Sequence, residues 1–153
     1  MVAGAIADLR RDRLAALRSL LRANGLPDDD CENSAIYFCG VFDGDDLVAA
    51  GGLEPVPPYA LLRSVVVAPE HRGKGLARRI GSQLLERAAR ERCAAVYLLT
   101  ETAQDYFAGL GFDCVAREQV PAEVAATRQF SSICPASADC MRKLPPFDLP
   151  EAE

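Results

Sequence analysis

The residues best suited to chemistry form a short charged loop between a hydrophobic run and an amphipathic one. The hydrophobic run ends at Pro69, and Arg72, Gly73, Lys74 and Gly75 follow just before apolar residues begin to recur at helical spacing. Free N–H groups at a helix start attract anions, and the helix dipole adds to this attraction. Glycine lets the backbone approach a ligand closely because it carries no Cβ. The segment therefore predicts a pyrophosphate site.

Three kinds of phosphate-binding loop compete for this segment. A dinucleotide loop needs Gly-x-Gly-x-x-Gly, but Arg78 stands at the third glycine position. A P-loop needs Gly-x-x-x-x-Gly-Lys-Ser/Thr, which the chain does not contain. The longer string Val-x-Pro-x-x-Arg-Gly-x-Gly-Leu-Ala, from Val67 to Ala77, resembles the acetyl-coenzyme A signature of the GNAT N-acetyltransferases. A tight turn with incidental charge would explain a lone Gly-x-Gly, but not the whole string.

A second motif lies downstream of the loop. GNAT enzymes usually carry Tyr-x-x-x-Gly-Phe at the end of a short helix, and the string from Phe107 to Phe112 resembles it with phenylalanine at the tyrosine position. The two motifs cover about 60–115. The resemblance implies an α/β (α+β) chain with the GNAT (acyl-CoA N-acyltransferase) fold, a mixed central twisted β-sheet flanked by helices. We expect a single domain over 1–144 and an acidic, proline-containing tail over 145–153.

Hydrophobic periodicity and turn residues predict the elements that must position these motifs. We expect helices over 9–23, 74–92 and 103–110, and a helical turn over 122–128. We expect strands over 35–42, 47–53, 60–67, 94–100 and 112–117, and a final strand within 129–143. The turn Asp-Gly-Asp-Asp at 43–46 should join the first two strands as a hairpin.

The resemblance implies acetyl-CoA as cosubstrate, wedged between the splayed strands 60–67 and 94–100. The backbone of Val67 should pair with its pantetheine arm. Thr100 stands where many family members carry an asparagine near the cofactor. The pyrophosphate should be held by the amides of Arg72, Gly73, Lys74, Gly75, Leu76 and Ala77.

Catalysis of acetyl transfer to an amine needs a base, an oxyanion donor and a departing thiolate. Glu54 ends a strand and could take a proton through water, although it could equally be a solvated strand end. The N–H of Val65 is the expected oxyanion donor. Phe107 cannot donate a proton. Tyr106, one residue earlier, is the remaining candidate acid, but its rotation by about 100° predicts that it faces the core instead. A coenzyme A thiol with a pKa of about 8.5 can leave without a dedicated acid.

The nature of the acceptor depends on two arginines. Alternation places Arg63 on one face of its strand with Val65 and Val67. A guanidinium there would bind a substrate carboxylate in a two-pronged way, or form a structural salt bridge, for example to Glu54. Arg128 is a second candidate for the carboxylate.

Three stretches, 52–54, 61–65 and 130–138, resemble a narrower group, the GNAT proteins associated with arsenic resistance. That group is similar to the acetyltransferase domain of N-acetylglutamate synthase. The resemblance implies a small amino-acid-like amine as acceptor and a homodimer as the assembly. Two alternatives stay open, namely a non-catalytic sensor of coenzyme A or an arsenical, and a protein N-terminal acetyltransferase. Cys134 and Cys140 could bind an arsenical as paired thiols, but two cysteines that pack at a strand end are the simpler interpretation.

Charge and composition exclude other classes. The 153 residues carry a net charge of −5, which disfavours a protein that coats nucleic acid. The segment 63–92 holds eight Arg or Lys and three Glu, so it is locally +5. One histidine and six cysteines without a Cys-x-x-Cys pair predict no metal site. No apolar run approaches the ~20 residues of a membrane span, and we expect a cytoplasmic protein.

Overall fold

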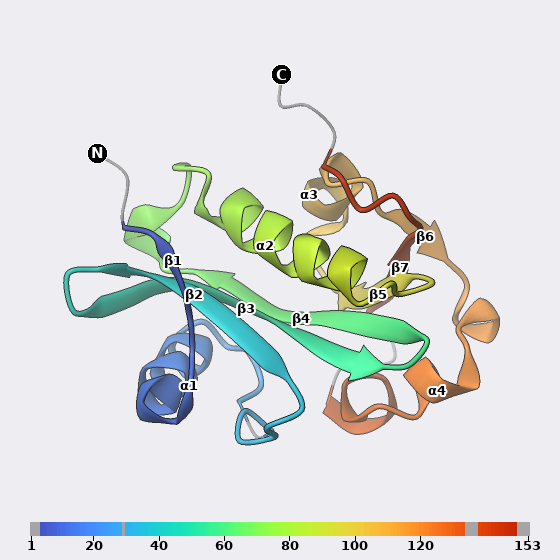
Figure 1. Ribbon diagram of the computed structural model, residues 1–153, viewed down its shortest axis with the longest axis horizontal. Coiled ribbons are helices and arrows are strands. Elements are labelled where there is room, and N and C mark those ends of the chain that lie inside the picture. Colours follow the sequence, from blue (N-terminus) through green and yellow to red (C-terminus); the bar gives the residue numbers. More distant parts are fainter. Residues whose placement is uncertain (1–3, 29, 134–137, 150–153) are drawn as a thin grey trace. The chain divides into compact units, whose positions relative to one another are not determined.

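The computed structural model describes residues 4–28, 30–133 and 138–149. Its helices are α1 (Leu14–Ala23), α2 (Leu76–Arg90), α3 (Gln104–Gly109) and α4 (Ala122–Ala125). Its strands are β1 (Ile6–Asp8), β2 (Tyr37–Asp43), β3 (Asp46–Val56), β4 (Tyr59–Val67), β5 (Val96–Thr100), β6 (Asp113–Val115) and β7 (Asp139–Lys143) (Figure 1).

The strands follow the order β1-β2-β3-β4-β5-β7-β6 in one seven-stranded sheet. β4 and β5 run parallel, with Ala60 opposite Val96 and Leu61 opposite Tyr97, and α2 forms the connection between them. β1 with β2, β2 with β3, β5 with β7 and β6 with β7 are antiparallel. The sheet is therefore mixed, as the sequence predicted.

The chain divides into two compact units, and β3, β4 and α2 contribute residues to both. The first unit comprises Met1–Glu54 and Arg63–Leu84, and the second comprises Pro55–Leu62 and Leu85–Glu153. In the first unit, α1 and α2 lie on opposite faces of the sheet (Figure 1).

Two adjacent glycines show how closely side chains approach β3 in the first unit. A Cβ on Gly51 would lie 2.6 Å from Cγ2 of Ile80 on α2, whereas a Cβ on Gly52 would lie 2.6 Å from the ring of Phe38 on β2. Consecutive residues of a strand point to opposite faces. Phe38 therefore lies on the face of the sheet opposite α2.

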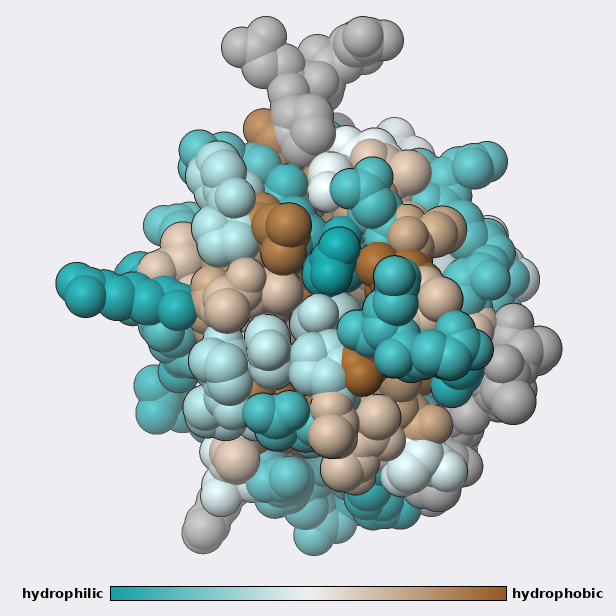
Figure 2. Space-filling model, turned by 90° about the vertical axis from the view of Figure 1, so that its right-hand side faces the viewer, coloured by the Kyte–Doolittle hydropathy of each residue, from teal (hydrophilic) through white to brown (hydrophobic). Residues whose placement is uncertain are grey.

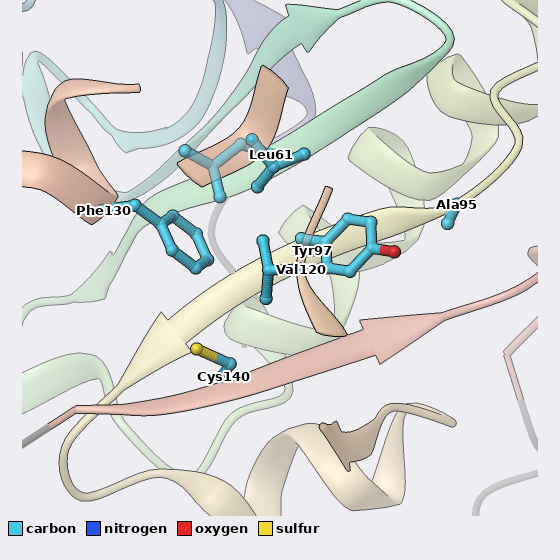
Figure 3. Packing of buried hydrophobic residues seen from close by; sticks show 7 residues of the cluster. Leu61, Ala95, Tyr97, Val120, Phe130 and Cys140 are labelled. Carbon is cyan, nitrogen blue, oxygen red and sulfur yellow. The ribbon is translucent and has the colours of Figure 1, made fainter. Parts of the chain in front are cut away.

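The core of the second unit forms where β4, β5 and β7 meet the segment that follows α3 (Figure 3). Its buried residues are Leu61, Ala95, Tyr97, Val120, Val124, Phe130 and Cys140. On the surface of the side that carries α3, α4 and β6, hydrophobic residues form separate spots among hydrophilic ones (Figure 2). Large exposed hydrophobic side chains among the described residues are confined to Tyr106 and Leu144.

The expected elements are all present, but several boundaries differ. The predicted helix over 9–23 begins only at Leu14, after a 3₁₀ turn at Arg11–Arg13. The segment 129–143 opens with a π-helical turn at Gln129–Ile133 and becomes a strand at Asp139. β1 was not predicted, because three residues are too few to show alternation.

Candidate functional site

The loop between β4 and α2 presents backbone groups to solvent. Gly73 and Gly75 adopt φ values of +81° and +78°, in the left-handed region that glycine enters without a Cβ penalty. Apart from the glycine itself and its two chain neighbours, no heavy atom lies within 4 Å of the Cβ position at either residue. α2 begins at Leu76 rather than at Lys74, because the left-handed Gly75 precedes its first turn. The loop fits the predicted pyrophosphate site in backbone conformation and in open space.

The two cations of this loop behave differently. Nε of Arg72 donates to the carbonyl oxygen of Val67 at 3.1 Å, and its NH2 donates to Oδ1 of Asn24 at 3.2 Å. Asn24 caps the C-terminal end of α1 by donating to the carbonyl oxygen of Leu20. Lys74 is exposed and makes no hydrogen bond or ion pair within the described part of the chain. Arg72 therefore anchors the loop, whereas Lys74 is available to a ligand.

The carbonyl oxygen of Val67 can bind a ligand in addition to Arg72. A carbonyl oxygen has two lone pairs, so the Val67 oxygen can accept a second hydrogen bond while it holds Arg72. The hydrogen bond from Arg72 to Asn24 could not be predicted from local sequence, because the two residues are 48 positions apart.

A left-handed residue interrupts β4 just before the expected oxyanion donor. Ser64 has φ +58°. The side chain of Val65 lies beside Gly51 on the α2 face, whereas the guanidinium carbon of Arg63 lies 5.9 Å from the ring centroid of Phe38 on the other face. The expectation that Arg63 and Val65 share a face is therefore wrong, because the Ser64 conformation breaks the alternation.

Arg63 forms a buried ion-pair cluster on the face opposite α2. Its guanidinium binds both carboxylate oxygens of Asp30, and its NH1 donates to Oε1 of Glu54 at 3.0 Å. The Arg63 side chain is 1% exposed, against 8% for Asp30 and 17% for Glu54. Burial alone would lower the pKa of Arg63, but the hydrogen bonds and charge of Asp30, then of Glu54, outweigh it and raise that pKa.

Of the two readings that the sequence left open for Arg63, this geometry matches the salt bridge. Glu54 is the partner that the sequence suggested, and Asp30 was missed because no periodic signal marks a loop residue that reaches a strand. Oε1 of Glu54 is held by Arg63, and its second oxygen has no partner among the described residues. Glu54 thus combines a fixed orientation with one oxygen that is available to solvent.

The remaining predicted residues belong to the second unit. Oγ1 of Thr100 accepts a hydrogen bond from the backbone N–H of Ala103, just before α3. Phe107 is 9% exposed and packs edge-on against Phe112, with ring centroids 6.0 Å apart. Tyr106 is 36% exposed, so the expectation that it faces the core is wrong. The apolar face of α3 is defined by Phe107, and its neighbour in sequence is turned outward.

Arg128 is exposed on the segment between α4 and the π-helical turn. Cys140 is buried, whereas Cys134 lies outside the described residues, so the suggested thiol pair cannot be placed. No group of three or more His, Cys, Asp or Glu arranged to hold a metal ion occurs in 4–28, 30–133 or 138–149. Within those same ranges, every helix is too short or too polar to cross a membrane.

Comparison with solved structures places the fold among acetyltransferases. Rv2747 from Mycobacterium tuberculosis, in complex with CoA, matches with a TM-score of 0.76 at 20% identity, over 92% of this chain and 99% of that one. N-acetylglutamate synthase from Neisseria gonorrhoeae, with coenzyme A and N-acetyl-glutamate, gives 0.76 at 13% identity, over 92% of this chain and 35% of that one. A ribosomal-protein alanine N-acetyltransferase from Escherichia coli gives 0.70 at 15% identity, over 92% of both chains.

A comparison with curated proteins finds no matching sequence. The family model described as "Acetyltransferase (GNAT) family" matches residues 6–112, which is well over half of the chain. This span includes the whole of the loop between β4 and α2 and reaches the phenylalanine that ends the second motif. The chain therefore belongs to the GNAT family of acetyltransferases.

Proposed function

We propose that this protein transfers the acetyl group of acetyl-CoA to the amine of a small molecule in a ternary complex. The observation that carries the proposal is the loop over 72–77, whose left-handed glycines leave open space at the start of α2. The amides of this loop bind the pyrophosphate, and Lys74 adds a full charge. The coenzyme A complexes among the structural relatives support the same cosubstrate.

The residues of the first unit supply most of the chemistry in this proposal. Glu54 takes the proton of the amine through water with the oxygen that Arg63 does not hold. The N–H of Val65 donates to the oxyanion, and the backbone of Val67 pairs with the pantetheine arm. Holding both reactants together lowers the barrier by several kcal/mol. The thiolate leaves without a dedicated acid, so Tyr106 is a candidate proton donor on which the reaction does not depend, and Thr100 is a further contact to the cosubstrate.

The acceptor in this proposal is a small amino-acid-like amine, with Arg128 as the candidate ligand of a carboxylate. The likeness to N-acetylglutamate synthase supports it. A role in arsenic resistance rests on the resemblance of the three short stretches alone. The proposal treats 1–144 as one catalytic domain, 145–153 as a tail, and the protein as a cytoplasmic homodimer.

A calorimetric titration with acetyl-CoA, followed by a thiol-release screen, tests the proposal. The screen contains amino acids, carboxylate-free amines and arsenic-containing amino-acid analogues. We expect saturable binding of acetyl-CoA and thiol release with at least one small amine. Absence of binding at millimolar acetyl-CoA would refute the proposal.

A non-catalytic sensor is the second candidate, and Phe107 in place of the usual tyrosine is the observation that favours it. Tight binding of coenzyme A without acetylation of any amine would support it. Protein N-terminal acetylation is the third candidate, supported by the likeness to the ribosomal-protein acetyltransferase. Acetylation of peptides and of no small amine would favour that candidate.

A further inference from the structure

The guanidinium of Arg63 links its own strand to two other segments of the first unit. It binds Asp30 in the loop after α1, Glu54 in β3 and Oγ of Ser64 in β4, the last at 3.2 Å from Nε. These hydrogen bonds use all but one of its N–H groups. Arg63 thus lacks a free pair of donors for the two-pronged binding of a substrate carboxylate.

The partners of Arg63 are the groups on which the proposed reaction depends. One is Glu54, the proposed base. Another is Ser64, whose left-handed backbone turns the strand so that Val65 faces α2 while Arg63 faces away from it. Left-handed φ is unfavourable for a residue with a side chain, and the hydrogen bond from Arg63 helps to hold Ser64 there.

Asp30 fixes the guanidinium itself. The two side chains form a two-pronged pair and are 8% and 1% exposed. A pair of this kind is short, directional and strong. Removing one partner of a buried ion pair leaves an uncompensated buried charge, which destabilises the folded site.

We propose that Asp30 and Arg63 are positioning residues. Asp30 fixes Arg63, and Arg63 fixes both the carboxylate of Glu54 and the Ser64 conformation that places the N–H of Val65. This inference rests on the proposed function and replaces the role of Arg63 as a ligand of the acceptor carboxylate.

The first test separates positioning from carboxylate binding. Wild type, Asp30→Asn and Arg63→Gln are assayed with matched pairs, such as ornithine with putrescine and lysine with cadaverine. We expect both variants to lower kcat by about tenfold or more for both members of a pair, with KM for acetyl-CoA within about twofold. A rise in KM restricted to the amino acids in Arg63→Gln would overturn the proposal.

Glu32→Gln is the matched control, since Glu32 is an exposed acid of the same loop that pairs with Arg18. It changes the net charge by the same amount as Asp30→Asn, and we expect its kcat to stay within about twofold of wild type. Asp30→Glu keeps the carboxylate and should recover part of the lost kcat. The same loss in Glu32→Gln, or no recovery in Asp30→Glu, would contradict positioning by the Asp30 carboxylate.

Hydrogen exchange tests the positioning role of Asp30 without any measurement of turnover. We expect Asp30→Asn to speed amide hydrogen exchange in a peptide covering 63–67 and to leave the exchange rate of 72–77 unchanged. In Glu32→Gln the exchange rates of both segments should equal those of wild type. If wild type acetylates no amine, the proposed function fails while this comparison still stands. Unchanged exchange over 63–67 would refute the positioning role, whatever the activity.

Discussion

Arg72 closes the end of β4 through its side chain, because its Nε donates to the carbonyl oxygen of Val67, 3.1 Å away. The same guanidinium reaches Oδ1 of Asn24 at the end of α1. The Arg72 side chain, one of the two charges of the predicted pyrophosphate loop, is thus engaged with protein atoms. Its contribution to ligand binding is to hold the loop in place so that the loop amides can bind.

Replacing Arg72 by lysine should weaken the binding of acetyl-CoA. An ammonium group presents its donors from a single nitrogen, so it does not span Val67 and Asn24 as the two nitrogens of the guanidinium fork do. For an exposed contact of this kind we expect a loss of about 1 kcal/mol, which raises Kd about fivefold. Calorimetric titration measures the change. Arg10→Lys is the control, because Arg10 is exposed and lies outside this loop, and an equal loss in that variant would contradict the argument.

Replacing Gly75 by alanine should destabilise the protein. At φ +78° an added Cβ is strained although the space around it is open, and the cost is about 1–2 kcal/mol. Gly109 offers a matched control, since its surroundings are equally open and it lies in α3. Gly109 is the last residue of that helix, and there the same change should leave the free energy of unfolding unchanged or raise it by less than about 1 kcal/mol.

Urea denaturation of the two alanine variants gives the difference in the free energy of unfolding. Gly75→Ala should also weaken the binding of acetyl-CoA, because the loop must leave its left-handed conformation. If Gly75→Ala were as stable as Gly109→Ala, alanine would adopt the left-handed conformation at position 75 without a cost in the free energy of unfolding.

The loop was predictable because its function depends on local sequence. Glycines, a charged neighbour and a following helix all lie within a few residues, so the string from Val67 to Ala77 indicates both conformation and ligand. The hairpin at 43–46 was predictable for the same reason. The short strand β1 lacked a local signal, since its pairing with β2 depends on residues far along the chain.

The ion-pair cluster was only half predictable. The sequence indicated that Arg63, in an apolar strand, needs a partner, and it named Glu54. Asp30 and the break at Ser64 depend on tertiary contacts. A single left-handed residue reverses the faces that alternation assigns to every later position in the strand, and no propensity of serine predicts it.

Tyr37 should ionise only at strongly alkaline pH. Its hydroxyl donates to Oδ1 of Asp8 at 2.7 Å and accepts from Nε2 of Gln83 at 3.2 Å. Burial, followed by the hydrogen bond to Asp8, raises the pKa of Tyr37 to about 12. Because this value exceeds the ~10 of an unfolded chain, the associated stability is fully present below pH ~10. It is lost as the pH rises through the folded pKa.

A spectrophotometric titration of wild type minus Tyr37→Phe should therefore show one phenol that ionises near pH 12. Tyr37→Phe should also lower the free energy of unfolding at neutral pH by about 1–2 kcal/mol, because it removes one donor and one acceptor. A difference titration centred near pH ~10 would show that the hydroxyl is solvated like a free tyrosine.

The last prediction concerns the missing acid in α3. Tyr106 is exposed, whereas Phe107 packs against Phe112 at the position where the family usually has tyrosine. Since a thiol with a pKa of about 8.5 leaves as the thiolate near neutral pH, Tyr106→Phe should keep kcat within about twofold of wild type.

Phe107→Tyr completes this comparison, since it restores the hydroxyl that the family usually has. The added group would lie in a site that is 9% exposed, and burying it without a partner costs about 1–3 kcal/mol. We expect a lower free energy of unfolding and no gain in kcat. A tenfold fall in kcat for Tyr106→Phe, about 1.4 kcal/mol in the barrier, would instead identify Tyr106 as the proton donor. A rise in kcat for Phe107→Tyr would show that departure of the thiolate limits the rate. An added proton donor can speed the reaction only if that step is slow.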